Sequence, residues 1–186
     1  MTRPGADWNP RHSVQATARR TADLVNALAP ERPDPAAVAD VLRAHGEPGP
    51  LDLTPDDITQ LRAAAVPLRA VLAAPDADTA AALLNTLLRD SAHHLRLTSH
   101  GGGTPWHPRL DRHDDAPWGE RFLASSCLAL TVLVWDQQRP PGGTCASPSC
   151  RNVFLAQSRG LERRYCSRRC ATRERVAAHR RARAAT

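Results

Sequence analysis

Four of the five cysteines in this chain fall into two close pairs near its C-terminal end. Four residues separate Cys145 from Cys150, three separate Cys166 from Cys170, and fifteen lie between the pairs. Each pair bends the backbone so that two thiolates point at one centre, a spacing typical of a tetrahedral zinc site. Two disulfides or four unrelated thiols are the alternatives. The paired spacing favours the metal, so we predict one structural zinc ion bound by Cys145, Cys150, Cys166 and Cys170.

The residues around the cysteines predict a small treble-clef-like module. Asn152–Leu155 has the pattern of a strand, residues 157–162 that of a turn, and Arg163–Tyr165 that of a returning strand. Ser167 stands at a helix N-cap position, and no Gly or Pro interrupts residues 168–183. The predicted module contains too few apolar residues to be stable by burial alone. Zinc binding therefore has to stabilise it, and the binding free energy of structural zinc is typically ~10–16 kcal/mol.

This stretch resembles the CGNR-type zinc finger proteins of bacteria, whose pattern is a cysteine pair, F-x-D-x-S-R, R-R-[YW]-C-S and then C-G-N-R with a basic helix. The matching residues are Cys145, Cys150, Phe154, Ser158, Arg159, Arg163, Arg164, Tyr165, Cys166, Ser167, Cys170 and Arg173. The chain departs from the pattern at Ala156, where the family has Asp, and at Ala171-Thr172, where it has Gly-Asn. All four ligand positions are kept, so the resemblance implies a zinc finger.

The preceding residues predict a mainly helical domain with one β-hairpin. Five helices are expected. The first covers 13–28, the second runs from Pro35 to the residue before Gly46, and the third begins at Pro55 and is kinked at Pro67. The fourth begins at Asp76 or Asp78 and continues through Leu88, and the fifth covers 117–137. The hairpin is expected to pair 94–98 with 104–106 across a glycine turn. The predicted fold class is therefore α+β, with a domain over 1–138, a linker over 139–143 and the zinc module over 144–186.

Two short motifs in the helical region resemble the ABATE domain, which usually precedes the CGNR finger in stress-induced transcription regulators. They are Asp23-Leu24-Val25-Asn26 and Arg43-Ala44-His45-Gly46. The resemblance implies DNA binding by the finger and a sensing or interaction role, with a small-molecule or protein effector, for the larger domain. Asp23 and Asn26 either line a pocket or hydrogen-bond locally.

Charge is distributed unevenly along the chain. Residues 1–150 carry 14 Arg against 17 acidic residues, whereas residues 151–186 carry 11 Arg against 2 Glu. A basic C-terminal segment on an acidic body suggests a polyanionic partner, and we predict duplex DNA. The candidate contacts are Arg159, Arg163, Arg164, Arg168, Arg169, Arg173, Arg175, Arg180, Arg181 and Arg183.

Other functions are possible for such a chain. A zinc module can also bind RNA or a protein, and nothing in the sequence separates these targets from DNA. An enzyme is suggested only by a group of histidines and aspartates, which matches no catalytic or metal template: His93, His94, His100, His107, His113, Asp111, Asp114 and Asp115. We therefore expect a binding protein and no catalytic residues.

The N-terminal residues lack the apolar segment of a signal peptide. The longest uncharged apolar stretch, residues 122–135, is too short to span a bilayer. These features predict a cytoplasmic protein with no membrane partner, in a compartment that keeps thiols reduced.

Overall fold

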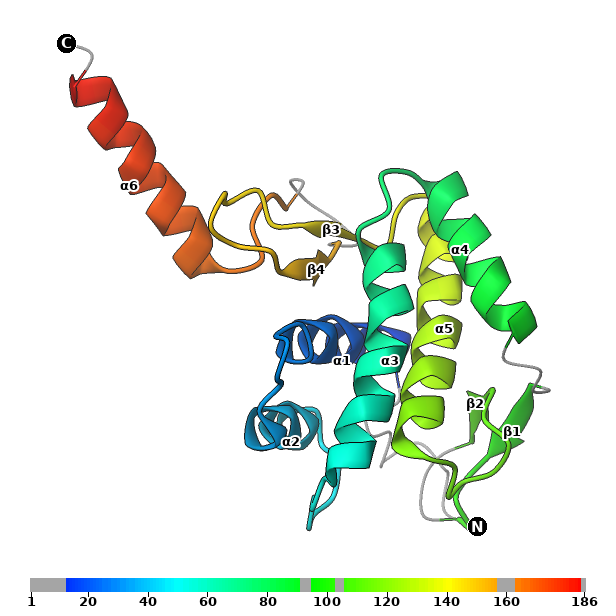
Figure 1. Ribbon diagram of the computed structural model, residues 1–186. Helices are drawn as coiled ribbons and strands as arrows, with labels where there is room; N and C mark the ends of the chain where they lie inside the picture. The colour runs from blue at the N-terminus through cyan, green and yellow to red at the C-terminus, as the bar shows by residue number, and fades with distance from the viewer. Residues whose placement is uncertain (1–12, 91–94, 103–105, 157–162, 185–186) are drawn as a thin grey trace, which may run out of the picture.

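The computed structural model describes residues 13–90, 95–102, 106–156 and 163–184, which form a mainly helical body and a projecting helix (Figure 1). The helices are α1 (Val14–Ala27), α2 (Pro35–Ala44), α3 (Pro55–Leu72), α4 (Ala77–Asp90), α5 (Trp118–Gln137) and α6 (Arg168–Ala184). The strands are β1 (Arg96–Thr98), β2 (His107–Arg109), β3 (Gly142–Thr144) and β4 (Val153–Leu155). They form two separate antiparallel hairpins, β1–β2 and β3–β4, which confirms the α+β prediction.

The helices begin where their capping residues indicate. Ser13, Asp34 and Thr54 each accept a hydrogen bond from a backbone N–H of the first turn of α1, α2 and α3. Asp76 accepts one from Thr79 N at 2.7 Å and so caps α4. Gly46, at φ +79°, follows the end of α2, a conformation that glycine adopts without strain. The positions of these helices were therefore readable from local sequence signals.

The helical body is built around the contact between α3 and α5, which run side by side (Figure 1). α1 packs across both of these helices, α2 covers α1, and α4 covers the other side. The fully buried side chains include Leu24, Leu61, Leu68, Leu72 and Leu130. Within the described ranges, no helix is long and apolar enough to cross a membrane.

The hairpin in the body is shifted from its predicted position. β1 begins at Arg96, close to the expected strand, but its partner is His107–Arg109 rather than Thr104–Trp106. Pro108 stands opposite Leu97. A two-stranded sheet has free edges, and a proline at an edge costs no ladder hydrogen bond. Residues 103–105 lie outside the described part of the chain.

The second hairpin includes the last two residues of the predicted linker over 139–143. Gly142 and Gly143 form β3 and pair with Leu155 and Phe154. A Cβ on Gly142 would lie 2.5 Å from the carbonyl oxygen of Phe154 and 2.8 Å from that of Leu72. Only glycine therefore allows β3 to pass between β4 and the end of α3. The division of the chain into domains at this point remains a prediction.

All three residues of β4 are buried, and two of them belong to the core of the helical body. Val153 is 1% exposed and Leu155 8% exposed, and both lie in the same apolar cluster as the helix residues. β4 packs on α1 and α3. The side chain of Asn26 completes this contact: its Nδ2 donates to the Val153 carbonyl at 2.9 Å, and its Oδ1 accepts from the Val153 N–H at 2.9 Å.

The double hydrogen bond of Asn26 generates the first prediction. Asn26→Ala leaves the Val153 N–H and carbonyl without their partner, which should lower the free energy of unfolding by about 1–3 kcal/mol. Urea unfolding of the zinc-loaded protein measures this. Asn85→Ala, an exposed asparagine on α4, is the matched control and should change stability by less than about 0.5 kcal/mol. Equal effects of the two substitutions would contradict the role assigned to Asn26.

Candidate metal centre and basic helix

The first cysteine pair lies in a tight turn that follows β3. Cys145 N donates to the Asn152 carbonyl at 2.9 Å, and Cys150 N donates to the Ser147 carbonyl at 2.9 Å. Ala146 N donates to the Arg164 carbonyl at 2.9 Å, which brings the segment before the second cysteine pair against this turn. The predicted hairpin between 152–155 and 163–165 is therefore wrong, because β4 pairs with β3 and residue 164 bonds to the turn instead.

The second cysteine pair belongs to the start of α6. Ser167 Oγ accepts from Cys170 N at 3.2 Å, as predicted for an N-cap, and places Cys170 on the first turn of the helix. Cys166 N donates to Cys145 Sγ at 3.4 Å across the site. Backbone hydrogen bonds thus fix both pairs before any ligand bond to a metal is considered.

The four sulfur atoms form one compact cluster. All lie within 4.8 Å of one another, with Cys150 Sγ and Cys166 Sγ at 3.6 Å and Cys166 Sγ and Cys170 Sγ at 3.7 Å. A tetrahedral zinc ion with bonds of about 2.3 Å needs sulfur atoms about 3.8 Å apart. A disulfide needs about 2.05 Å, so no cysteine pair here is a disulfide. Within the described residues this is the one metal-suited cluster, and its geometry and sulfur ligands suit a single zinc ion.

The thiols of the cluster share their protons unequally. Burial raises the pKa of Cys145, but hydrogen bonds from the backbone N–H groups of Cys166 and Ser147 and from neighbouring thiols outweigh it and lower the pKa to about 7. Burial, and donation of its proton to Cys150 and Cys145, raise the pKa of Cys166 to about 12. Metal binding needs thiolates, so loading the site releases protons and zinc affinity falls as pH falls.

A second layer of polar contacts surrounds the cluster. Ser147, 2% exposed, donates to Glu174 Oε1 at 2.5 Å and accepts from Arg173 NH2 at 2.6 Å. Arg173 NH2 also lies 3.5 Å from Cys170 Sγ. Such contacts orient metal ligands and reduce their charge repulsion. Glu174 is the only acidic residue in a helix with seven arginines, which is the one sequence signal that could have indicated this role.

The CGNR zinc finger family model matches residues 143–183 of this chain. The match covers the four cysteines, β4 and nearly all of α6. No curated protein matched the chain. The C-terminal part is thus similar to a CGNR zinc finger in both sequence pattern and cysteine geometry.

The structure divides the predicted nucleic-acid contacts into two groups. Arg163 donates to the carbonyl oxygens of Tyr165 and Cys166 and stacks over Phe154, and Arg173 is held by Ser147. Arg159 lies outside the described residues. Arg173 is exposed despite its contact with Ser147, and the other described candidates, all exposed as well, are Arg164, Arg168, Arg169, Arg175, Arg180, Arg181 and Arg183.

Within the described residues, the side chains of Asp23 and Asn26 hydrogen-bond to distant partners rather than to near neighbours. Asp23 pairs with His45 at 2.8 Å, and Asn26 binds Val153. Both also line a cleft of about 1210 Å³ between α1, α2 and the zinc module. A pocket was the alternative prediction for these two residues, but no local sequence pattern indicated that the zinc module would form the far wall of the pocket. Arg69 on α3 was also missed, and it donates to the Arg151 carbonyl next to the module.

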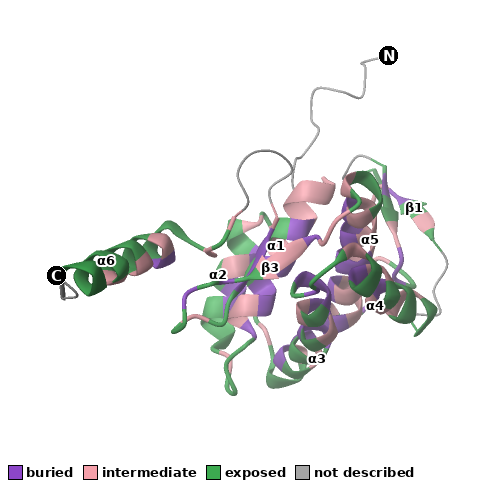
Figure 2. Cartoon of the chain, turned by 90° about the horizontal axis from the view of Figure 1, so that it is seen from above, coloured by how far each residue is buried: buried purple, intermediate pink, exposed green. Residues whose placement is uncertain are grey.

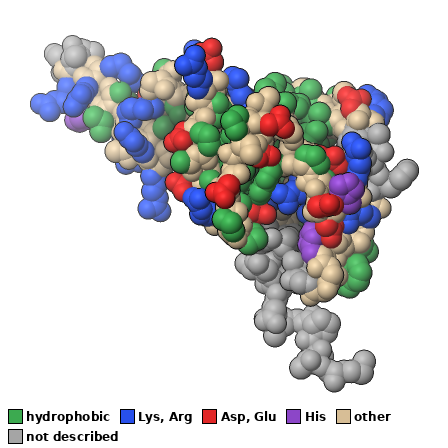
Figure 3. All heavy atoms as spheres, turned by 60° about the horizontal axis from the view of Figure 1, so that its bottom comes forward, with side chains coloured by type: hydrophobic (Ala, Val, Ile, Leu, Met, Phe, Trp, Pro, Cys, Tyr) green, Lys and Arg blue, Asp and Glu red, His purple; other side chains and the backbone are tan. Residues whose placement is uncertain are grey.

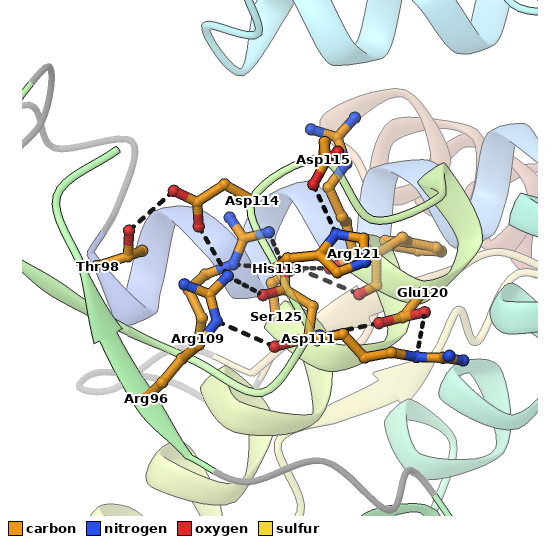
Figure 4. A network of polar contacts seen from close by, with 12 residues as sticks. Arg96, Thr98, Arg109, Asp111, His113, Asp114, Asp115, Glu120, Arg121 and Ser125 are labelled. Atoms are coloured by element: carbon orange, nitrogen blue, oxygen red, sulfur yellow. Dashed lines mark hydrogen bonds and ion pairs between the residues drawn. The ribbon is translucent and has the colours of Figure 1, made fainter. Parts of the chain in front are cut away.

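The described aspartates of the histidine and aspartate group form ion pairs with arginines or with histidines of the same group (Figure 4). Asp111, 1% exposed, accepts from Arg96 and Arg109, and Asp114 accepts from Arg96 and from Thr98. Burial raises the pKa of Asp114, but these hydrogen bonds and the charge of His100 outweigh it and lower the pKa. The carboxylates thus tie the β1–β2 hairpin to the loop before α5. His93 and His94 lie outside the described residues.

Removal of a ligand generates the second prediction. Metal analysis should find about one zinc per wild-type chain and almost none in Cys166→Ser, because a structural site needs its four ligands. Cys127→Ala is the control, since Cys127 is buried in the helical body with its pKa raised to about 12 by burial. It should keep the zinc. Stoichiometric zinc in Cys166→Ser would refute the ligand assignment.

Arg173 generates the third prediction. Arg173→Ala removes the hydrogen bond to Ser147 and the contact with Cys170, which should weaken zinc affinity by about 10- to 100-fold. Competition with a chelator at fixed pH measures this. Arg181→Ala, on the same helix but without a contact to the cluster, should leave zinc affinity unchanged. Unchanged affinity in Arg173→Ala would return Arg173 to the set of solvent-exposed charges.

Proposed function

We propose that this protein is a zinc-dependent DNA-binding transcription regulator in which α6 contacts the duplex. The observation that carries the proposal is the helix itself. α6 holds seven Arg and one Glu, and it projects from the body with its C-terminal end pointing away (Figure 1). Among residues 168–183 only Cys170 is buried, so the helix is exposed on nearly all sides (Figure 2).

Such a helix is not expected to be stable without a binding partner. It buries almost no apolar side chain, and a helix of this length is marginal in water without packing. The positive charges of its arginines repel one another, and an anionic partner would reduce this repulsion by neutralising them. Figure 3 shows basic side chains along this arm, while the acidic side chains in that view lie mainly over the body. A protruding basic helix of about 25 Å fits the major groove of a duplex.

One face of α6 is best placed to meet the duplex. Arg168, Arg175 and Arg183 are spaced by seven and eight residues, close to two turns each, and therefore share a face. Cys170 points the opposite way, into the metal cluster. Arg181 follows Cys170 by eleven residues, about three turns, and lies on the metal side. We call Arg168, Arg175 and Arg183 the outer stripe.

Positive charge also continues beside the base of the helix. Arg19 of α1 and Arg169 line the cleft between the helical body and the zinc module. A phosphate backbone running along α6 would approach this cleft as it passes the module. The metal centre supports this geometry by fixing the first turn of α6 against the turn that carries Cys145 and Cys150.

We also propose that residues 1–138, which precede the zinc module, form an ABATE-type domain. Its support is the pair of short motifs and their contacts, since Asn26 of the first motif binds β4 of the module and His45 of the second pairs with Asp23. We propose a regulatory role and no enzymatic one for this domain, because Asp111, Asp114 and His100 form ion pairs that tie the β1–β2 hairpin to the loop before α5.

The salt dependence of DNA binding generates the fourth prediction. Each phosphate neutralised on duplex DNA contributes roughly −0.9 to the slope of log K against log salt. Four to six contacts by α6 and its neighbours would give a slope between about −3.5 and −5.5. Arg175→Ala and Arg183→Ala should each make the slope shallower by about one. Arg181→Ala, with the same charge change on the metal side of the helix, should have a smaller effect.

Three outcomes decide between DNA and the other targets. Loss of binding on zinc removal, together with a larger effect of the outer stripe than of Arg181, supports the proposal. Preference for structured or single-stranded RNA over duplex DNA at matched salt would replace DNA by RNA. A flat salt response, or no nucleic-acid binding at physiological salt, would indicate that α6 binds a protein instead.

A further inference from the structure

A second cleft lies inside the helical body, away from the metal centre. It has a volume of about 760 Å³ and is bounded by α1, α5 and the β1–β2 hairpin. Ligand sites in proteins typically measure about 300–1,000 Å³ and combine apolar walls with a few polar groups. The apolar wall here includes Leu24, Trp118, Phe122, Leu128 and Val132.

Arg121 is the unusual polar group in this cleft. Its guanidinium stacks over the Trp118 ring at 4.1 Å, and its Nε is buried without a hydrogen-bond partner. Among the described residues, no hydrogen bond or ion pair joins the guanidinium of Arg121 to another side chain, although its backbone carbonyl accepts from Ser125 Oγ at 2.7 Å. Burial lowers its pKa, although an arginine remains protonated at neutral pH. The Arg121 side chain is partly buried, and withdrawing a charge from water without a counter-ion lowers stability.

The acidic residues near the cleft are already paired with other groups. Glu47 lies 3.6 Å from Arg20, whose NH2 also donates to Ser125 Oγ at 3.1 Å. Asp114 accepts from Arg96 and Thr98, and Asp111 binds Arg109. Figure 4 shows that Asp111 and Asp114 are bonded to Arg96, Thr98 and Arg109, and that Arg121 and Ser125 lie nearby. The positive charge of Arg121 is thus left for a group that enters the cleft.

We propose that this cleft binds a small organic carboxylate with an apolar body, its carboxylate on Arg121 and its apolar part along Trp118 and Phe122. The planar guanidinium fork matches a carboxylate, and the buried Nε is one of its donors. The apolar wall contributes affinity by burial, which an inorganic anion could not use. This site is independent of the nucleic-acid proposal and does not involve the zinc module.

Calorimetric titration of the zinc-loaded full chain tests the site. The probes are 1-naphthoate and its neutral analogue 1-naphthamide, which share an apolar body and differ in charge. We expect 1-naphthoate to bind with a Kd below about 1 mM and the amide about tenfold more weakly, the difference for one charge-assisted interaction. Equal affinity for the two probes would overturn the proposal. So would the absence of detectable 1-naphthoate binding up to about 10 mM.

Substitution of Arg121 separates a binding role from a structural one. Arg121→Met should weaken 1-naphthoate binding at least about tenfold and raise the Tm of the ligand-free protein by about 2 °C, because it removes a partly buried charge that has no counter-ion. Arg62→Met, an exposed arginine on α3, is the matched control and should leave 1-naphthoate binding unchanged. Wild-type affinity in Arg121→Met would overturn the proposal.

If the Arg121→Met variant does not fold, Arg121→Lys tests whether the guanidinium of Arg121 binds the carboxylate. Lysine keeps the positive charge but lacks the two-pronged donor fork, so 1-naphthoate should bind about tenfold more weakly. Unchanged affinity in this variant would show that the fork does not hold the carboxylate, which would also overturn the proposal.

Discussion

The burial of β4 is the constraint on which the rest of the arrangement depends. Val153 and Leu155 fill the core between α1 and α3, and Asn26 satisfies both backbone polar groups of Val153. A strand buried in this way cannot leave the body without exposing apolar surface and unpaired hydrogen-bonding groups. The zinc module is therefore continuous with the helical core, and the metal centre and α6 take their positions from this attachment.

In the zinc module, metal coordination provides the stability that a hydrophobic core provides in the helical body. The residues around the cysteines bury few apolar side chains, and the helix that follows buries only Cys170 between residues 168 and 183. Sulfur coordination, the Ser167 cap and the Arg173–Ser147–Glu174 contacts hold the first turn of α6. Beyond that turn the helix is free of packing constraints, so its surface can be almost entirely basic. A rigid base with an unconstrained charged arm is what contact with a polyanion requires.

Arginine does three different kinds of work in a chain that has no lysine. Arg96 and Arg109 neutralise the buried Asp111, and Arg163 and Arg69 bind backbone carbonyls around the zinc module. The outer stripe of α6 faces solvent. Arg121 belongs to none of these groups, since it is partly buried and lacks an acidic partner among the described residues. Composition alone could not separate these roles, because the difference between them lies in what each guanidinium meets after folding.

The sequence by itself determined the four cysteines, the helix caps, the order of the helices and the basic character of the last one. Each of these depends on neighbours within a few residues, where spacing and capping chemistry act directly. Only the tertiary structure decided the rest: β3 as the partner of β4, the bond from Asn26 to Val153, the use of Arg173 at the metal centre, and the isolation of Arg121. Those features join residues up to 127 positions apart, and no local pattern specifies which distant backbone or charge a side chain will meet.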